Sequence, residues 1–167
     1  ADAMVNFARA GMTAREIIAA TGPALMMAGG AGESMSLATM SLAGSLKQFS
    51  LDASESGHVA DVFTVALKNS LFNLQGLNDA MKYAGPIGAA FGMSLEDTTA
   101  AVAQFRNMGL DASMAGTAFR MTLIQLSKGT PKAEAALKKY GLTLEDVNPE
   151  MHSFRDIMLK FAKANIS

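Results

Sequence analysis

The sequence contains no cysteine and no tryptophan, and only 17% of its residues are charged. The absence of cysteine excludes a disulfide framework, a thiolate nucleophile and a zinc–thiolate site. The formal net charge is −1, so the chain lacks the bulk positive charge that marks many nucleic-acid-binding proteins. Long hydrophobic runs are also missing. The longest uncharged stretch, Ile17 to Gly32, is shorter than the roughly 20 residues that a membrane-spanning helix needs.

Apolar residues, by contrast, are abundant: they make up 50% of the 167 positions and include 13 methionines. This composition is too apolar for a disordered chain, and the length suffices for one domain with its own core. Flexible methionines and small side chains suit helices that pack closely together. The chain begins without a methionine, so we interpret residues 1–167 as a single helical module excised from a longer chain.

Capping residues and helix-stopping glycines predict an all-α fold. Thr13 begins a capping box with Glu16, in which the threonine oxygen accepts a backbone N–H and the glutamate reaches back to the cap. Further caps are expected at the starts of other helices, where serine, threonine and aspartate are favoured, namely at Asp52, Ser94, Asp111 and Thr130. We therefore expect a compact bundle of about seven or eight short helices, arranged as stacked helical hairpins, the last of them over about residues 151–164.

Glycine and proline also predict interruptions. Gly22-Pro23 should end or kink the helix that begins after Thr13, because proline lacks an N–H donor and clashes with the preceding turn. The run Gly-Gly-Ala-Gly at residues 29–32 predicts a loop, and Ser36 is the expected cap of the next helix. Pro86 should bend a helix over about residues 74–91.

An internal repeat is expected over residues 35–69 and 93–127. The four residues Leu-Asp-Ala-Ser at positions 51–54 recur at positions 110–113. Ala53 and Gly57 share one helix face, as do Ala112 and Gly116, because each pair is four positions apart. Small residues at this spacing let two helices approach closely, so we predict that all four pack helices together. Chance similarity among small residues is the alternative explanation of the repeat.

Residues that could carry chemistry are few and scattered. His58 and His152 are the only histidines, and neither has a second histidine at metal-ligand spacing, although Asp61 could pair with His58. The acidic pairs at positions 96–97 and 145–146 fit an interaction with helix dipoles. Residues 29–32 lack the Lys-Ser or Lys-Thr of a phosphate-binding loop. We therefore predict no catalytic residue, no metal site and no cofactor.

Several stretches, taken in their order and spacing, resemble the phage tail tape measure protein family. Residues 92–102 and 107–120 carry the clearest part, a small-residue helix, a glycine-containing turn and a helix that begins near Ala-Gly-Thr-Ala-Phe-Arg. Leucine is usual in the family where this chain has Phe119. Residues 51–62, 80–90 and 136–142 fit other family stretches, whereas residues 29–33 and those beyond Val147 match least.

The resemblance implies a structural role and no catalytic residues. Tape measure proteins occupy the lumen of the tail tube in the virion, set tail length during assembly in the bacterial cytoplasm, and leave ahead of the genome at infection. The implied partners are tail tube proteins, tail tip proteins and tail assembly chaperones, and no specific nucleic-acid sequence is expected. Exposed methionine and leucine on several helices would also favour association with other copies of the chain.

Two other functions compete with this one. In the first, the apolar stretches at residues 17–32 and 83–95 insert into the host membrane during DNA delivery. In the second, the chain is a muralytic enzyme, for which the sequence offers no acid or nucleophile constellation. A ruler should be a long extended helix, whereas this sequence has frequent glycine and proline breaks, so we expect a folded region of the ruler rather than its measuring stretch.

Overall fold

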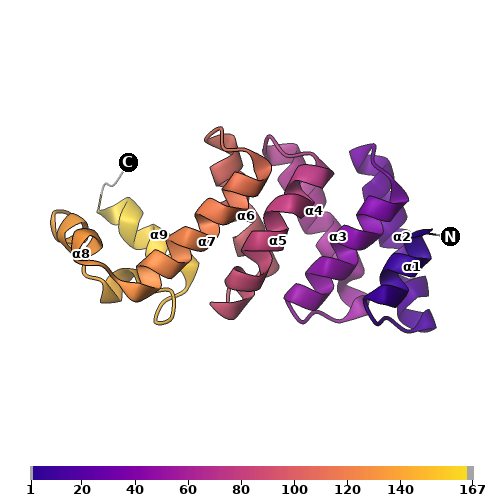
Figure 1. Cartoon of the computed structure of the whole chain (residues 1–167), viewed down its shortest axis with the longest axis horizontal. Coiled ribbons are helices and arrows are strands. Elements are labelled where there is room, and N and C mark those ends of the chain that lie inside the picture. The colour runs from indigo at the N-terminus through magenta and orange to yellow at the C-terminus, as the bar shows by residue number, and fades with distance from the viewer. Residues whose placement is uncertain (1, 165–167) are drawn as a thin grey trace.

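A computed structural model describes residues 2–164, and all regular structure in that range is helical. The all-α prediction is therefore confirmed, but these residues form nine α-helices rather than the seven or eight expected, together with two short 3-10 helices (η1 and η2) (Figure 1). Their bounds are α1 Asp2–Arg9, α2 Ala14–Ala31, α3 Met35–Gln48, η1 Ala53–Glu55, α4 Ser56–Asn69, α5 Leu74–Ala90, α6 Leu95–Asn107, α7 Ala112–Lys128, α8 Pro131–Lys138, η2 Glu145–Val147 and α9 Phe154–Lys163.

The first seven helices form two rows, because each packs against the helix two positions further along the chain. One row contains α1, α3, α5 and α7, and the other contains α2, α4 and α6. The chain crosses between the rows at each turn, so all helices of one row run in the same direction. The result is an elongated array with α1 and α2 at one end rather than a compact bundle around one axis (Figure 1).

Two separate clusters of buried apolar residues stabilise this array. The large cluster runs through α1 to α7 and includes the fully buried Leu42, Phe63, Leu77 and Phe119. The small cluster lies beyond the rows and contains three buried residues from α8, η2 and α9, namely Leu137, Val147 and Ile157. Because buried apolar area is the main stabilising contribution, the C-terminal part depends on far less of it than the rows do.

The expected helix end at Gly22-Pro23 and the predicted loop over residues 29–32 are wrong. The helix continues through Pro23 and through residues 29–31, and it ends only at Gly32, which has a left-handed φ of 66°. Ala24 and Met27 lie beyond the proline and are buried against the neighbouring helices. Burial of this second half outweighs the donor lost at Pro23, because tertiary packing regularly overrides local propensity.

Other boundaries also differ from the sequence prediction. The cap of α3 is Ser34, whose side chain accepts the N–H of Leu37, and not Ser36. Ser36 instead lies in the first turn of α3, where its carbonyl and its hydroxyl both accept hydrogen bonds from the Asn6 amide of α1, at 3.0 and 3.1 Å. The helix around Pro86 agrees with the prediction, because α5 runs from Leu74 to Ala90 with the proline inside it. The last helix begins after Ser153 rather than near residue 151.

Candidate interaction surfaces

Several turns between helices share one local pattern. A residue with positive φ ends a helix, one residue follows, and a serine, threonine or aspartate then begins the next helical segment. In five such turns the middle residue donates its N–H to the carbonyl five positions earlier, as Met12 does to Phe7 and Met93 to Gly88. This is the Schellman bond, which satisfies a carbonyl at the end of a helix. The turns are centred on Met12, Glu33, Leu51, Met93 and Leu142.

Four of the five predicted caps accept backbone hydrogen bonds at helix starts. The Thr13 hydroxyl accepts the N–H of Glu16, and the Glu16 carboxylate accepts the N–H of Thr13 at 2.6 Å. The oxygens of Asp52, Ser94 and Thr130 accept from Ser54, Asp97 and Ala133, respectively. The fifth prediction needs correction: Asp111 holds the cap position of α7, but its side chain makes no capping bond. In the turn before Asp111, the Arg106 guanidinium donates a hydrogen bond to the carbonyl of Leu110.

Helices α5 and α7 approach each other closely through small residues. A Cβ added at Gly116 would lie 2.9 Å from the carbonyl carbon of Ala80 and closer still to its oxygen. One turn away, a Cβ added at Gly76 would lie 3.3 Å from the Cβ of Ala112. Gly76 and Ala80 on α5 are four positions apart, as are Ala112 and Gly116 on α7. Gly76 therefore faces Ala112, and Ala80 faces Gly116. We did not predict the α5 pair, although the same spacing in the sequence could have identified it.

The corresponding residues of the other repeat copy do not make such a contact. A Cβ added at Gly57 would meet no atom within 4 Å, so its predicted role in close helix packing is wrong. Ala53 is buried, but it lies in η1 rather than in the same regular helix as Gly57. The two copies also occupy different rows. The first helix of residues 35–69 is α3, in the row with α1, α5 and α7, whereas the first helix of residues 93–127 is α6, in the row with α2 and α4.

The two histidines lie far apart on the chain, and each contacts a charged residue. His58 on α4 lies 2.6 Å from the Glu96 carboxylate of α6, so its partner is Glu96 rather than Asp61. Burial by itself would raise the pKa of Glu96, but hydrogen bonds from its backbone N–H, Ser94 and His58 bring that pKa below its usual value. His152 lies 3.2 Å from the Lys160 ammonium, near the start of α9.

Lys160 also links α9 to the turn around η2. The Asp146 carboxylate accepts the hydroxyl and backbone N–H of Thr143, at 2.8 and 3.0 Å, and the Lys160 ammonium at 3.1 Å. These donors, the Thr143 hydroxyl first, lower the pKa of Asp146 to about 2. A carboxylate held in its charged form by hydrogen bonds stabilises the fold that supplies them.

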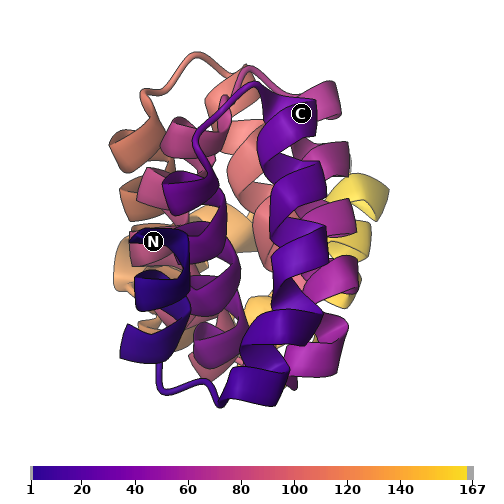
Figure 2. The same ribbon diagram turned by 90° about the vertical axis from the view of Figure 1, so that its right-hand side faces the viewer.

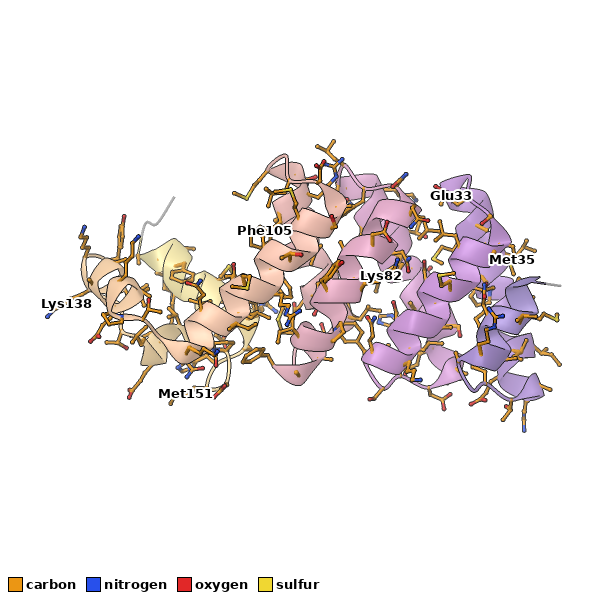
Figure 3. The ribbon with its side chains drawn as sticks, in the orientation of Figure 1. Glu33, Met35, Lys82, Phe105, Lys138 and Met151 are labelled. Carbon is orange, nitrogen blue, oxygen red and sulfur yellow. The ribbon has the colours of Figure 1, made fainter. Side chains whose placement is uncertain are left out.

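Two apolar grooves flank α6. The first lies between α4 and α6, has a volume of about 420 Å³, and includes His58 and Glu96 in its lining together with the exposed Val65. The second lies between α6 and α9 over α7, and has a volume of about 530 Å³. Phe105 of α6 and Met108, which follows the last residue of α6, line it together with Phe119 of α7 and Phe161 of α9 (Figure 3 labels Phe105). Such surfaces are suited to packing against apolar groups rather than to bond-breaking chemistry.

The sequence matches the model of a known protein family over residues 1–166, and the family is described as phage-related minor tail protein. The chain belongs to this family. Two relatives carry tape measure names. A tape measure protein of Pneumococcus phage Dp-1 is 32% identical over the whole chain, and a probable tape measure protein of Escherichia phage P2 is 33% identical over 87% of it. The chain spans only 15% and 18% of the lengths of these relatives. No solved structure matches it significantly.

For this member of the minor tail protein family, the likeness to tape measure proteins is thus confirmed. Over the described residues, no group of three or more histidine, aspartate or glutamate side chains is arranged to hold a metal ion. Within residues 2–164, no helix is both long enough and apolar enough to cross a membrane.

Proposed function

We propose that this chain is a structural, non-catalytic segment of a tape measure protein that acts in tail assembly and genome ejection as a folded unit. The likeness to two tape measure proteins over 87% and 100% of the chain carries this proposal. Within it, residues 1–167 form one helical module of a longer protein, and we interpret the two rows as stacked helical hairpins. The inferred location is the lumen of the tail tube, reached after synthesis in the host cytoplasm.

The arrangement of the helices supports a folded unit rather than a measuring stretch. An uninterrupted helix of this chain would extend about 250 Å, since each residue adds about 1.5 Å. In the array, however, helices of 8 to 18 residues lie side by side, so most of the chain runs across the long axis. We therefore expect it to set little of the tail length, and to serve through contacts with tail tube proteins, tail tip proteins and assembly chaperones.

The test is an in-frame deletion of residues 1–167 from the parent phage, with tail length measured by electron microscopy. Tails of unchanged length that fail to deliver DNA, or a failure to assemble tails, would support the proposal. Tails shortened by about 250 Å would contradict it, because that loss corresponds to a fully extended helix. A deletion phage that assembles, infects and keeps its tail length would also contradict it.

A second candidate is a module that acts on the host membrane during DNA delivery. The observation in its favour is the exposed apolar surface of α2, where Ile18, Leu25 and Met26 face away from the array. Dye release from liposomes by the purified chain would support this function. A peptidoglycan clearing assay provides the corresponding test for enzymatic activity, and we expect no clearing.

A further inference from the structure

The helix at one end of the array, α2, is apolar on both faces. Its inner face contains Ala20, Ala24 and Met27, which are buried against α3 and α4. Its outer face is also apolar, with Ile18 74%, Leu25 63% and Met26 71% exposed. Figure 2 looks onto this end and shows α2 in front of the array (Figure 2). A helix that is apolar all round is normally buried all round, whereas no described residue covers the outer face of α2.

Two glycines on that outer face favour a helix as the partner. Gly22 and Gly29 are seven positions apart and therefore lie on the same side of α2 as Ile18 and Leu25. A Cβ added at either glycine would meet nothing within 4 Å, so no contact within the array explains them. Each glycine costs about 1 kcal/mol in a helix interior relative to alanine. In the α5–α7 contact the same feature, Gly116 against Ala80, admits a neighbouring helix closely.

At the other end of the same row, no described helix packs into the row beyond α6. Helix α6 packs against α4 on one side, and its opposite side forms the wall of the 530 Å³ groove. That wall includes Phe105 and Met108, of which Met108 is 78% exposed. Helix α9 forms the opposite wall but is not packed into the row beside α6. A helix entering the groove would extend the series α2, α4, α6 by one member.

From these observations, we propose that α2 of one copy docks in the α6–α9 groove of the next copy, so that the arrays associate head to tail. All helices of this row run in the same direction, so α2 of the second copy would lie parallel to α6. Arg15 in the first turn of α2 would then lie near Asp97 in the first turn of α6. Met26, eleven residues after Arg15, would lie near Met108, which is eleven residues after Asp97.

Charge and symmetry both fit this occupant. Arg15 and Asp97 are exposed, have opposite charges, and make no salt bridge within the described residues. The contact joins two different faces, so a pair of copies still has one free α2 face and one free groove. Further copies can therefore add at both ends, which generates open chains rather than a closed dimer. This inference stands apart from the proposed function, since copies could stack whether or not the deletion shortens tails.

The first test is sedimentation of the purified chain over a range of concentrations, with one substitution in each face. Leu25→Glu alters only the α2 face, and Met108→Glu alters only the groove. Each should weaken association by about a hundredfold or more, because an unpaired charge would be buried. A 1:1 mixture of the two variants should form a heterodimer and nothing larger, since one intact face of each kind remains. Tyr83→Glu, on the exposed surface of α5 and in neither groove, is the control and should associate like the unmodified chain.

The second test uses the absence of native cysteine to trap the contact. A mixture of Met26→Cys and Met108→Cys chains should form mixed disulfides on mild oxidation, whereas either variant alone should not. Arg15→Asp or Asp97→Arg should each weaken association about two- to fivefold, and the double variant should restore it.

Several results would overturn the inference. A chain that stays monomeric at every concentration would do so, with or without dye release from liposomes. Association that Met108→Glu leaves intact while Leu25→Glu abolishes it would indicate an α2–α2 contact between copies. Disulfides formed by Met26→Cys alone would indicate the same α2–α2 contact. A loss of association caused by Tyr83→Glu would place the contact elsewhere.

Discussion

Alanine substitutions at two glycines that occupy corresponding positions in the sequence repeat should have opposite effects on stability. Gly116 lies four positions after Ala112, and Gly57 lies four positions after Ala53. Neither glycine has a positive φ. At Gly116 the new Cβ would lie 2.9 Å from the Ala80 carbonyl carbon, where ordinary contacts begin at 3.4 Å. The obstacle is backbone, which cannot rotate aside like a side chain, so α5 and α7 must move apart. At Gly57 the Cβ would meet nothing within 4 Å.

The expected magnitudes follow from these two environments. Overpacking of this kind costs about 1–3 kcal/mol, and alanine's better helix propensity returns up to about 1 kcal/mol. We therefore expect Gly116→Ala to lower the free energy of unfolding by about 1–2 kcal/mol and Tm by about 2–8 °C. Gly57→Ala gains helix propensity without a clash, so it should raise the free energy of unfolding by about 0.5 kcal/mol and Tm by about 1–2 °C.

The assay is urea unfolding of the purified chain followed by far-UV circular dichroism, with thermal melts alongside. A shift of the urea midpoint at constant slope reports a change in stability rather than a change in unfolded-state compactness. If Gly116→Ala proved as stable as the unmodified chain, the close approach of α5 and α7 would be wrong. If Gly57→Ala lost as much stability as Gly116→Ala, the open surroundings of Gly57 would be wrong.

Three further predictions concern other parts of the fold. Ser50 has a φ of 54°, so Ser50→Gly should raise the free energy of unfolding by about 0.5–1 kcal/mol in the same urea assay. The pKa of Asp146 is about 2 in the folded chain and about 3.9 when unfolded, so its stabilising effect is present above about pH 4 and is lost as pH falls towards 2. Asp146→Asn should therefore lower stability near neutral pH but not near pH 2, as measured by urea midpoints at both pH values. Amide hydrogen exchange should be faster over residues 131–163 than in α5 and α7, because only three buried residues form the C-terminal cluster; equal protection would contradict this reasoning.

Local chemistry made much of the helix pattern predictable. The caps at Thr13, Asp52, Ser94 and Thr130 depend on residues within three positions, so their signals are complete in the sequence. The same holds for Gly109, whose left-handed conformation ends a helix without contact to distant residues. Asp111 is the exception: it is a suitable residue at the cap position of α7, but its side chain makes no capping hydrogen bond.

The sequence predictions for α2 and for the partner of His58 were wrong because both depend on contacts between distant residues. Pro23 and residues 29–31 look like helix breaks in isolation, but burial of Ala24 and Met27 against other helices keeps α2 intact. The pairing of His58 with Glu96 joins residues 38 positions apart, which no local pattern indicates.

The sequence by itself determined the all-helical fold, most of the turns and the likeness to tape measure proteins, because these depend on neighbouring residues and on their order. Only the tertiary structure decided that the helices form two rows, that Gly116 touches a neighbouring backbone while Gly57 does not, and that α2 and α6 each leave an apolar face uncovered. The physical reason is that spacing along a helix identifies which residues share a face, whereas the partner of that face depends on how distant helices pack.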